Sequence, residues 1–474
     1  MDLDTTSFSN VINNCLTSTP ETRHGINPAN RQPNPEVPIS TGRDLEEAVK
    51  AARAAFKTWS TTDFDKRREA INAYAKSVEA NKSILAQLLT KEQGKPLSQA
   101  MQEVELAVHW ARTLVTLALP ETTLEDTDNR QILQRYTPLG VVGAIVPWNY
   151  PVVLAMGKII GAVYTGNAVI LKPSPYTPYC GLKLAELAMD HFPPGVMQAL
   201  SGDDTLGPMM TEHGGIDKIS FTGSTATGRL VMASCSKTLK RLTLELGGND
   251  AAIICDDIDL EAVIPKVATL AFLCSGQTCM TVKRLYIHEK IYDEFRARLV
   301  KFVGKFPMGE GTRPDVFIGP VQNWMQFNKA KVLMRTIEAD NLTAVLGGTV
   351  PESPGYFIPP TIVDNPPEAS RIVQEEPFAP ILPILKWSDE ADVIARANAS
   401  DMGLGASVWS QDLERARRIV DRLEAGNVWI NTHFEVEPFA PFGGHKSSGI
   451  GTEWGLLGLT QFCNSQTVYV KKSP

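Results

Sequence analysis

The stretch GVVGAIVPWNYP, residues 140–151, decides the fold class of this 474-residue chain. Its first half is a short apolar run rich in β-branched residues, which is typical of a strand that is buried on both faces. A helical pattern over residues 154–165 follows, and then a second apolar run at residues 168–171. Strand, helix and strand in this order predict a parallel sheet with helices on both faces. We therefore expect an α/β fold.

The same alternation extends along the chain on both sides of this stretch. It is followed by a predicted helix and two predicted strands, at 179–189, 197–200 and 218–221, and the pattern resumes after residue 250. Helical spacing of apolar residues precedes it over 44–60, 65–91 and 96–119. We expect a polar break at 120–130 and an irregular, polar start over residues 1–32. A chain of this length is too long for one core, so at least two domains are expected.

The composition excludes several classes of partner. The net charge is −7, from 46 basic and 53 acidic residues that are well mixed, and no basic block suggests a nucleic-acid surface. The apolar runs are too short to span a membrane, and the N-terminus MDLDTTSFSN has the features of neither a secretory signal nor a transit peptide. We therefore predict a cytoplasmic protein that acts on a small molecule, with no nucleic-acid and no membrane partner.

The cysteines point to one candidate nucleophile. There are seven, without a CxxC pair or a zinc-ligand spacing, so neither a disulfide framework nor a metal site is expected. Two lie in FLCSGQTCMTVKR, residues 272–284, where Cys274 falls in an apolar run and is predicted to be buried and inert. Cys279 follows a bend at Gly276 and begins a predicted helix through residue 283, which would lower the pKa of its thiol. A lone cysteine is more often a packing residue, but the bend and the helix start favour chemistry at Cys279.

Two further side chains could assist a nucleophile. Glu245 lies between leucines in LELGGND, residues 244–250, where desolvation would raise the pKa of its carboxyl towards that of a general base. The alternative is a glutamate paired to a nearby arginine or lysine. Asn149 follows a predicted strand in VPWNYP, residues 146–151, and its amide could donate to an oxyanion. Its alternative is an Asx turn before the proline.

Two predicted strand ends could bind a nucleotide. In FTGSTATGRLV, residues 221–231, Gly223 turns the chain and Ser224 can cap a helix whose free N–H groups favour a phosphate. The spacing is not GxGxxG, so an ordinary strand-to-helix turn is an equal alternative. In LKPSP, residues 171–175, Lys172 could reach a ribose or phosphate from the carboxyl end of a parallel strand. A solvated loop lysine is the alternative.

The set and order of the motifs carry more weight than any one of them. VPWNYP, LKPSP, FTGSTATG, LELGGND, SGQTC, EEPFAP and PFGGHKSSG resemble, in sequence and spacing, the motifs of the aldehyde dehydrogenase superfamily, from about residue 27 to 469. The resemblance implies a Rossmann-type nucleotide-binding domain, an α/β catalytic domain and a small β oligomerisation arm. The nucleotide-binding domain would comprise residues 1–119 and 140–247, and the catalytic domain residues 248–448. The arm would comprise residues 120–139 and 455–474. It also implies a homodimer or homotetramer.

The resemblance also assigns a chemical role to each candidate. Cys279 would attack the aldehyde to give a hemithioacetal and then a thioester, and the Asn149 side chain and the Cys279 N–H would hold the oxyanion. Glu245 would activate the water that releases the carboxylic acid. The cofactor would be NAD or NADP, bound by Trp148, Lys172, Ser174, Pro175, Gly223, Ser224, Gly228, Leu246, Glu376 and Phe378.

One departure from the family pattern bears on the cofactor. Many NAD-preferring relatives carry a glutamate three residues after the lysine, where this chain has Pro175. Loss of that carboxylate would remove a repulsion against a 2′-phosphate, so NADP becomes plausible. Lys172 could still bind a ribose hydroxyl, so NAD stays open as well.

The resemblance places the substrate tunnel at Tyr150, Leu154, Gly157, Thr278, Met280, Val436 and Phe442. Gly157 stands where several relatives have a bulky aromatic residue, which suggests a wider entrance. Because the lining is mostly apolar, a medium-sized or aromatic aldehyde is expected. Glu437 lies with His433 and Phe434 in the loop before PFGG. It could select a cationic aldehyde, or it could be a solvent-exposed charge at the rim of the tunnel, and the second interpretation is favoured.

Two other functions fit the same fold. A coenzyme A-acylating relative would pass its acyl group to a thiol and would not need Glu245, and a silent paralogue would have lost a core residue. Because Cys279, Asn149 and Glu245 are all present, the hydrolytic reaction is favoured. That chemistry needs no metal, since the oxyanion donors take the place of a Lewis acid.

Overall fold

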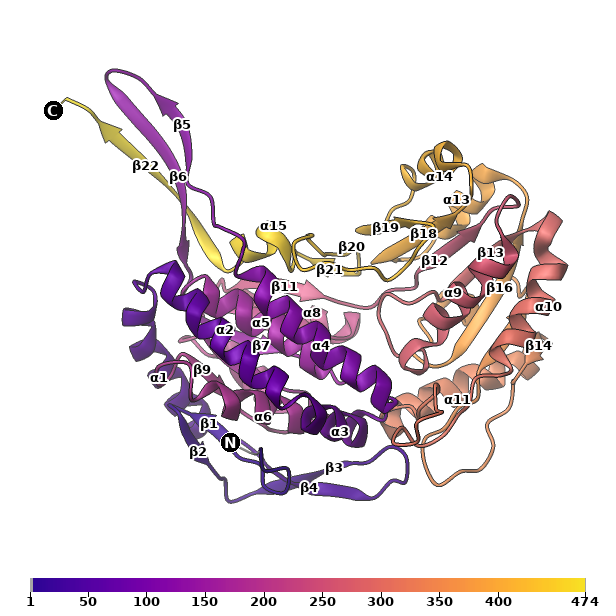
Figure 1. The fold of residues 1–474 in the computed structure, drawn as a ribbon, viewed down its shortest axis with the longest axis horizontal. Coiled ribbons are helices and arrows are strands. Elements are labelled where there is room, and N and C mark those ends of the chain that lie inside the picture. The colour runs from indigo at the N-terminus through magenta and orange to yellow at the C-terminus, as the bar shows by residue number, and fades with distance from the viewer. Residues whose placement is uncertain (1–2, 474) are drawn as a thin grey trace.

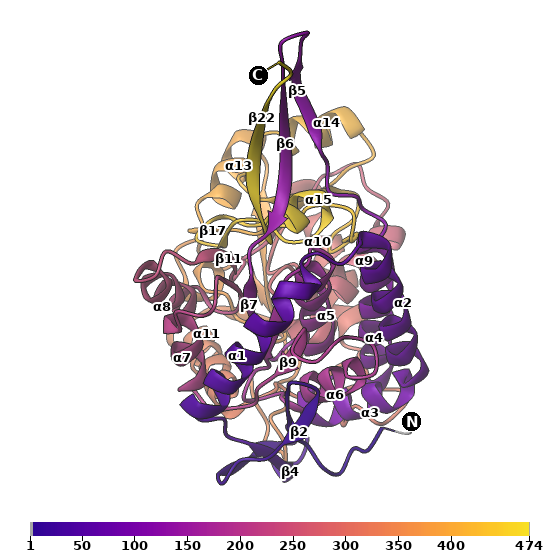
Figure 2. The same ribbon diagram turned by 90° about the vertical axis from the view of Figure 1, so that its left-hand side faces the viewer.

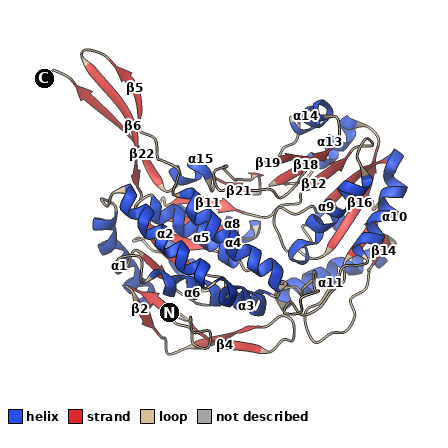
Figure 3. Ribbon diagram, viewed as in Figure 1, coloured by secondary structure: helices blue, strands red, loops and turns tan. Residues whose placement is uncertain are grey.

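The computed structural model describes residues 3–473, and two large sheets make up most of it (Figures 1 and 3). The first sheet has the strand order β2-β1-β9-β8-β7-β10-β11-β21. Its parallel strands are β7 (Val141–Ile145), β8 (Ala168–Lys172), β9 (Met197–Ala199), β10 (Lys218–Thr222) and β11 (Arg241–Glu245). Antiparallel strands at its edges are β1 (Asn10–Ile12), β2 (Cys15–Thr17) and β21 (Gly449–Ile450). The order changes direction between β7 and β10, which makes this position the topological switch point.

Helices cover both faces of the first sheet because its strands send alternate side chains into two apolar clusters. Val142 and Ala144 of β7 pack with one set of helices, and Val141 and Ile145 pack with the other. The first set is α2 (Phe64–Ala80), α3 (Lys82–Gln93), α4 (Leu97–Leu114), α5 (Pro151–Tyr164) and α6 (Tyr179–Ala188). The second set is α1 (Gly42–Trp59), α7 (Leu206–Glu212) and α8 (Thr225–Ser236).

The second sheet has the order β14-β15-β16-β13-β12-β18-β19 and is parallel except at its β14 edge. Its strands are β12 (Ala251–Ile254), β13 (Arg284–His288), β14 (Thr343–Leu346), β15 (Thr361–Asp364), β16 (Ile381–Trp387), β18 (Gly405–Trp409) and β19 (Asn427–Ile430). One face packs on α9 (Leu260–Phe272) and α10 (Tyr292–Val303). The other packs on α11 (Trp324–Ala339), α12 (Arg371–Gln374), α13 (Glu390–Asn398) and α14 (Leu413–Val420).

A third sheet projects from the body of the molecule as a narrow arm (Figures 1 and 2). It consists of β5 (Thr122–Asp126), β6 (Arg130–Pro138) and β22 (Cys463–Lys471), with β6 in the middle. The register of β22 against β6 is continuous from Cys463 opposite Pro138 to Lys471 opposite Arg130. The smaller elements are β3 (Thr22–Ile26), β4 (Pro33–Pro38), β17 (Met402–Gly403), β20 (His445–Lys446), α15 (Gly455–Thr460), and the 3-10 turns η1 (Leu273–Gly276) and η2 (Glu289–Ile291).

The predicted α/β class is confirmed, and two local predictions are wrong. The described residues 3–32 are not irregular throughout, because β1, β2 and β3 lie there. The helix before the polar break ends at Leu114 instead of near residue 119, while residues 120–130 do interrupt the helical pattern and contain β5. No helix among residues 3–473 is long and apolar enough to cross a membrane.

Candidate active site

The carboxyl ends of four parallel strands of the first sheet bring the predicted residues to one edge. β8 ends at Lys172, β11 ends at Glu245, β10 is followed by Gly223, and β7 leads into Asn149. These strands flank the topological switch point, where open α/β sheets bind their ligands. The second sheet contributes Cys279, in the loop that leads into β13.

Lys172 is a buried lysine at the end of β8. Its side chain does not reach bulk solvent, since the residue is 5% exposed, and its Nζ lies 3.4 Å from the carbonyl oxygen of Pro173. Desolvation lowers the pKa of its ammonium to about 8, and the charge of Asp204 partly opposes this. The alternative of a solvated loop lysine is therefore wrong. Ser174 is buried beside it, and Pro175 is partly exposed.

The start of α8 is an exposed helix N-terminus. Ser224 is its N-cap, and its Oγ accepts a hydrogen bond from the Thr227 N–H at 3.2 Å. The helix packs closely at its fourth residue, because a Cβ on Gly228 would lie 2.5 Å from a methyl carbon of Leu246. Free N–H groups in the first turn of such a helix attract anions.

Glu376 and Phe378 approach the same edge from the second sheet, in the segment between α12 and β16. A carboxylate oxygen of Glu376 accepts from the Gly248 N–H at 3.2 Å, and a Cβ on Gly247 would lie 2.7 Å from the other oxygen. The rings of Phe378 and Trp148 meet edge to face with centroids 5.3 Å apart. A buried cation, a free helix N-terminus and a carboxylate beside a glycine fit the phosphates and riboses of a nicotinamide dinucleotide.

The loop that carries Cys279 differs from its prediction. No helix begins at Cys279, which lies in a turn, while the helix α9 ends at Phe272 and η1 follows. Cys274, Ser275 and Gly276 take left-handed φ angles of 50°, 56° and 72°, which turn the chain out of the helical path. At Gly276 a Cβ would lie 2.3 Å from the carbonyl oxygen of Ala379, so only glycine fits there.

Side chains from three directions hold the carbonyl groups of this loop. The Asn149 amide donates to the Gln277 carbonyl at 2.9 Å, and Lys283 Nζ donates to the Cys279 carbonyl at 2.5 Å. His433 Nε2 lies 3.0 Å from the Met280 carbonyl. Asn149 is 4% exposed and bonds across the chain, so the Asx-turn alternative is wrong. One of its two amide protons remains for another acceptor.

Cys279 and Cys274 differ in access, as predicted. Cys274 is buried, whereas Cys279 is partly exposed. The expected depressed pKa is not found: desolvation raises the pKa of the Cys279 thiol to about 12, and Lys283 opposes this. The carboxylates of Glu376, Asp250 and Glu245 raise it further. The sequence analysis expected a helix N-terminus at Cys279 to lower this pKa. That helix does not form, so the predicted low pKa is wrong.

Glu245 is a buried carboxyl at the end of β11. It is 4% exposed, and neither of its oxygens has a hydrogen-bond partner among residues 3–473. Desolvation raises the pKa of this carboxyl well above its ordinary value, as expected, and the charge of Glu453 raises it further while Lys158 opposes. The alternative of direct pairing to an arginine or lysine is wrong for the described part of the chain.

A polar cluster that the sequence analysis missed lies near Glu245. Lys158 of α5 is 1% exposed and forms an ion pair with Glu453. The Ser220 hydroxyl accepts from Lys158 at 3.0 Å and donates to Glu453 at 2.7 Å. A lysine in the otherwise apolar helix α5 was the available signal, because a buried ammonium requires a partner.

Most of the expected tunnel residues share one apolar cluster with Cys279. Members of that cluster or residues packed on it are Tyr150, Leu154, Met280, Val436 and Phe442. Thr278, next to Cys279, is 1% exposed. Glu437 lies 3.7 Å from His109, and both side chains are about half exposed, as rim charges are.

The wider entrance expected at Gly157 is wrong. A Cβ on Gly157 would lie 3.0 Å from Nε1 of Trp454 and 3.8 Å from a ring carbon of Trp110. The two indoles meet edge to face with centroids 5.1 Å apart, and Trp454 also packs on Phe442. The space that an aromatic residue would fill at position 157 is therefore taken by tryptophans from other segments.

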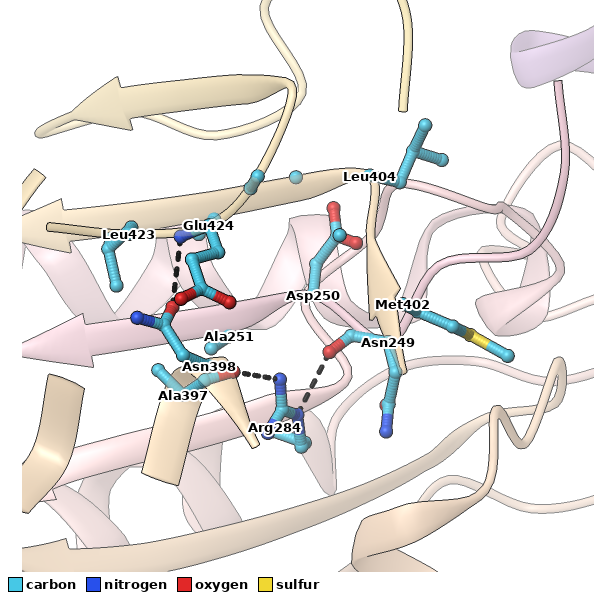
Figure 4. Close-up of a pocket in the computed structure, with 14 residues that line it drawn as sticks. Asn249, Asp250, Ala251, Arg284, Ala397, Asn398, Met402, Leu404, Leu423 and Glu424 are labelled. Atoms are coloured by element: carbon cyan, nitrogen blue, oxygen red, sulfur yellow. Dashed lines mark hydrogen bonds between the residues drawn. The ribbon is translucent and has the colours of Figure 1, made fainter. Parts of the chain in front are cut away.

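A small polar pocket lies beside the first residues of β12, β13 and β18 (Figure 4). Arg284 is fully engaged there, donating to the carbonyl groups of Asn249 and Ala397 at 2.9 Å each. The Asp250 carboxylate points away from Arg284, and within the described residues it accepts no hydrogen bond. One of its oxygens lies 3.6 Å from His433 Nε2. The negative charge of Asp250 is therefore not neutralised by Arg284, and it raises the pKa of the Cys279 thiol.

Comparison with known proteins agrees with this geometry. The model of the aldehyde dehydrogenase family matches residues 16–468. An aldehyde dehydrogenase of a Fusarium species is 40% identical over 99% of this chain and all of its own. The NAD+ complex of a Bacillus cereus aldehyde dehydrogenase matches with a TM-score of 0.96 and 32% identity, covering 98% of this chain and 97% of that one. An NADP-dependent enzyme of E. coli matches at 0.95 and 32%, covering 98% of each chain.

The match covers every segment that forms the site, and the site contains a thiol, a desolvated carboxyl and groups that suit a nicotinamide dinucleotide. The chain therefore belongs to the aldehyde dehydrogenase family, and it is an NAD(P)-dependent aldehyde dehydrogenase.

Proposed function

We propose that the chain oxidises a medium-sized or aromatic aldehyde to its carboxylic acid through a covalent intermediate on Cys279. The observation that carries the proposal is the convergence of three groups on one loop. Cys279 is the partly exposed thiol, Asn149 bonds to the loop two residues before it, and the unpartnered Glu245 is close enough to raise the pKa of the thiol.

In the first half of the reaction, Cys279 Sγ bonds to the aldehyde carbon and gives a hemithioacetal. The free amide proton of Asn149 and the N–H of Cys279 hold the oxyanion. Glu376, Lys172 and the start of α8 would hold the dinucleotide, whose nicotinamide would supply the acceptor for the hydride that leaves the hemithioacetal carbon. The product of this half is a thioester on Cys279.

In the second half, Glu245 takes a proton from a water molecule that attacks the thioester. An unpartnered carboxyl suits this role, because burial raises its pKa and so makes its carboxylate a stronger base than an exposed one. The proton can pass towards the nearby Glu453, which Lys158 and Ser220 hold in place. Hydrolysis releases the acid and restores the thiol.

Two variants separate the half-reactions. Cys279→Ala abolishes oxidation, whereas Glu245→Gln forms the thioester and then stalls. Rapid mixing of Glu245→Gln with aldehyde and cofactor is therefore expected to give one equivalent of reduced cofactor per site and little further turnover. Cys274→Ala, on the same loop, keeps steady turnover. Activity in Cys279→Ala would refute the nucleophile assignment.

The unpartnered Glu245 also supports water as the acyl acceptor, in place of coenzyme A. Steady-state rates with and without coenzyme A test this directly. A rate that requires coenzyme A and yields an acyl thioester would replace the hydrolytic proposal. If the chain turns over no aldehyde, the alternative of a catalytically silent paralogue would replace the proposal.

The aromatic lining supports the substrate class. Tyr150 and Phe434 face each other with ring centroids 6.4 Å apart, and Phe442 packs on Trp454 at 4.7 Å. Flat apolar substrates gain from such surfaces. A panel of aliphatic, aromatic and amino aldehydes tests the proposal through kcat/KM. The highest value is expected for an aromatic aldehyde, and a preference for short polar aldehydes would contradict it.

We further propose that the arm of β5, β6 and β22 pairs with a second copy of the chain in a homodimer or homotetramer. We also propose a cytoplasmic location, which cell fractionation tests.

A further inference from the structure

We propose that Lys283 is a positioning residue for the nucleophile, and that Glu376 controls how much of its positive charge acts on the Cys279 thiol. The inference rests on the proposed role of Cys279. Lys283 lies four residues after Cys279, and its side chain is 2% exposed. The sequence analysis gave it no role.

Lys283 joins the nucleophile loop to the candidate cofactor site. Its Nζ donates to the Cys279 carbonyl at 2.5 Å and lies 3.3 Å from Oε1 of Glu376. The same Glu376 oxygen accepts from the Gly248 N–H at 3.2 Å. A carbonyl satisfies a buried ammonium without neutralising it. The charge of Lys283 is therefore shared between the carboxylate of Glu376 and the thiol.

The thiol faces an unbalanced set of charges. Lys283 is the cation that lowers the pKa of Cys279, while Glu376, Asp250 and Glu245 each raise it. Asp250 is directed away from Arg284 and towards His433, so Arg284 does not neutralise it (Figure 4). Removing Lys283 should therefore make the thiol harder to ionise, and removing the charge of Glu376 should make it easier.

This arrangement couples the cofactor site to the nucleophile. The family resemblance makes Glu376 a cofactor-binding residue, so a bound dinucleotide would share the carboxylate with Lys283. Weakening that ion pair would leave more of the ammonium charge for the thiol. By thermodynamic linkage, ionisation of the thiol would favour cofactor binding to the same degree.

The test is the rate of Cys279 alkylation at pH 8 in the full-length protein without cofactor. Iodoacetamide labels the thiolate, and mass spectrometry of the peptides separates Cys279 from the exposed Cys15, which serves as an internal reference. Both Lys283→Met and Lys283→Gln are expected to label Cys279 roughly tenfold more slowly, because a smaller fraction of the thiol is ionised. Glu376→Gln is expected to label it faster by a similar factor.

Lys237→Met is the matched control, because Lys237 is exposed and pairs with Glu212 at 2.7 Å. It should leave the rate of Cys279 labelling unchanged. A purely structural role of Lys283 predicts no faster labelling in Glu376→Gln, because that variant keeps Lys283. An unchanged rate in both Lys283 variants, or a rate in Glu376→Gln that is not faster, would overturn the inference. If the Lys283 variants do not fold, the rate of Glu376→Gln alone decides. Failure of the proposed function would appear separately, as turnover by Cys279→Ala.

Discussion

At the residue scale, Pro175 bears on the choice between NAD and NADP. A glutamate at this position, three residues after the buried Lys172, would repel a 2′-phosphate. We expect Pro175→Glu to weaken NADP binding by roughly tenfold, equivalent to about 1.4 kcal/mol, and to affect NAD much less. Titration calorimetry measures both dissociation constants without turnover.

Pro175→Gln is the control for this experiment, because it has nearly the same size as glutamate without the charge. It should leave the ratio of the two dissociation constants near that of the natural chain. An equal loss of affinity for both dinucleotides in Pro175→Glu would mean that residue 175 does not face the 2′ position.

The buried carboxyl of Glu245 is expected to make the folded chain less stable as the pH rises. Burial raises the pKa of its carboxyl in the folded chain above the unfolded value. Above the unfolded pKa the folded state binds more protons than the unfolded state, so this group's contribution to stability falls as pH rises through the folded pKa. Glu245→Gln, which cannot ionise, is therefore expected to raise Tm at pH 8 by about 2 °C and to have little effect at pH 5.

Differential scanning calorimetry at both pH values measures this effect. Glu437→Gln is the comparison, since Glu437 is about half exposed on the rim. A Tm gain for Glu245→Gln that is equal at pH 5 and pH 8 would show that the carboxyl is not the source.

At the element scale, the nucleophile loop depends on one glycine. Gly276 has a φ of +72°, and a Cβ there would lie 2.3 Å from the backbone carbonyl of Ala379. Because neither group can yield easily, Gly276→Ala is expected to displace the loop. A displacement of about 1 Å at a reacting atom costs roughly a hundredfold in rate, so kcat should fall by about that factor.

Steady-state kinetics and NAD binding should be measured together on Gly276→Ala. The cofactor is expected to bind, because Lys172 and the start of α8 are on the other sheet. Gly214→Ala is the control, since a Cβ there meets nothing within 4 Å, and it should behave as the natural chain does. Full activity in Gly276→Ala would show that the loop tolerates the movement.

The same loop shows where sequence reasoning stops at this scale. Apolar runs of about five residues were long enough to predict β7, β8 and β10. They also predicted the edge of the sheet that carries Lys172 and Gly223. The three-residue strands β1 and β2 are too short for a periodicity. The helix predicted at Cys279 fails because Cys274 and Ser275 adopt left-handed φ, which neither residue type signals.

Long-range contacts were the other limit. Lys158 and Glu453 are 295 residues apart, so their pairing could not be inferred from spacing. The same holds for Gly157 and Trp454, where a missing side chain suggested open space and a distant indole fills it. The roles that the resemblance gave to Cys279, Asn149 and Glu245 stay predictions, and they depend on the order of motifs and not on local secondary structure.

At the scale of the whole molecule, the arm is the strongest reason to expect an oligomer. The strand β22 bonds to β6 along one side only, and its other side is an edge (Figure 2). Tyr469 of β22 is 73% exposed and Leu124 of β5 is 57% exposed, on either side of the central strand. Natural proteins rarely leave an exposed edge strand of this length without a partner.

Charged residues on the arm should therefore dissociate the assembly. We expect the chain to be a dimer or tetramer by light scattering, and Leu124→Asp with Tyr469→Asp to shift it to a smaller species, because two buried carboxylates per copy oppose strand pairing. Leu413→Asp, at a 51% exposed residue of α14 away from the arm, should leave the mass unchanged. A monomeric natural chain, or an oligomer that survives the double substitution, would mean that the arm is not the contact. A surviving oligomer would use another surface, and a monomer would have no subunit contact.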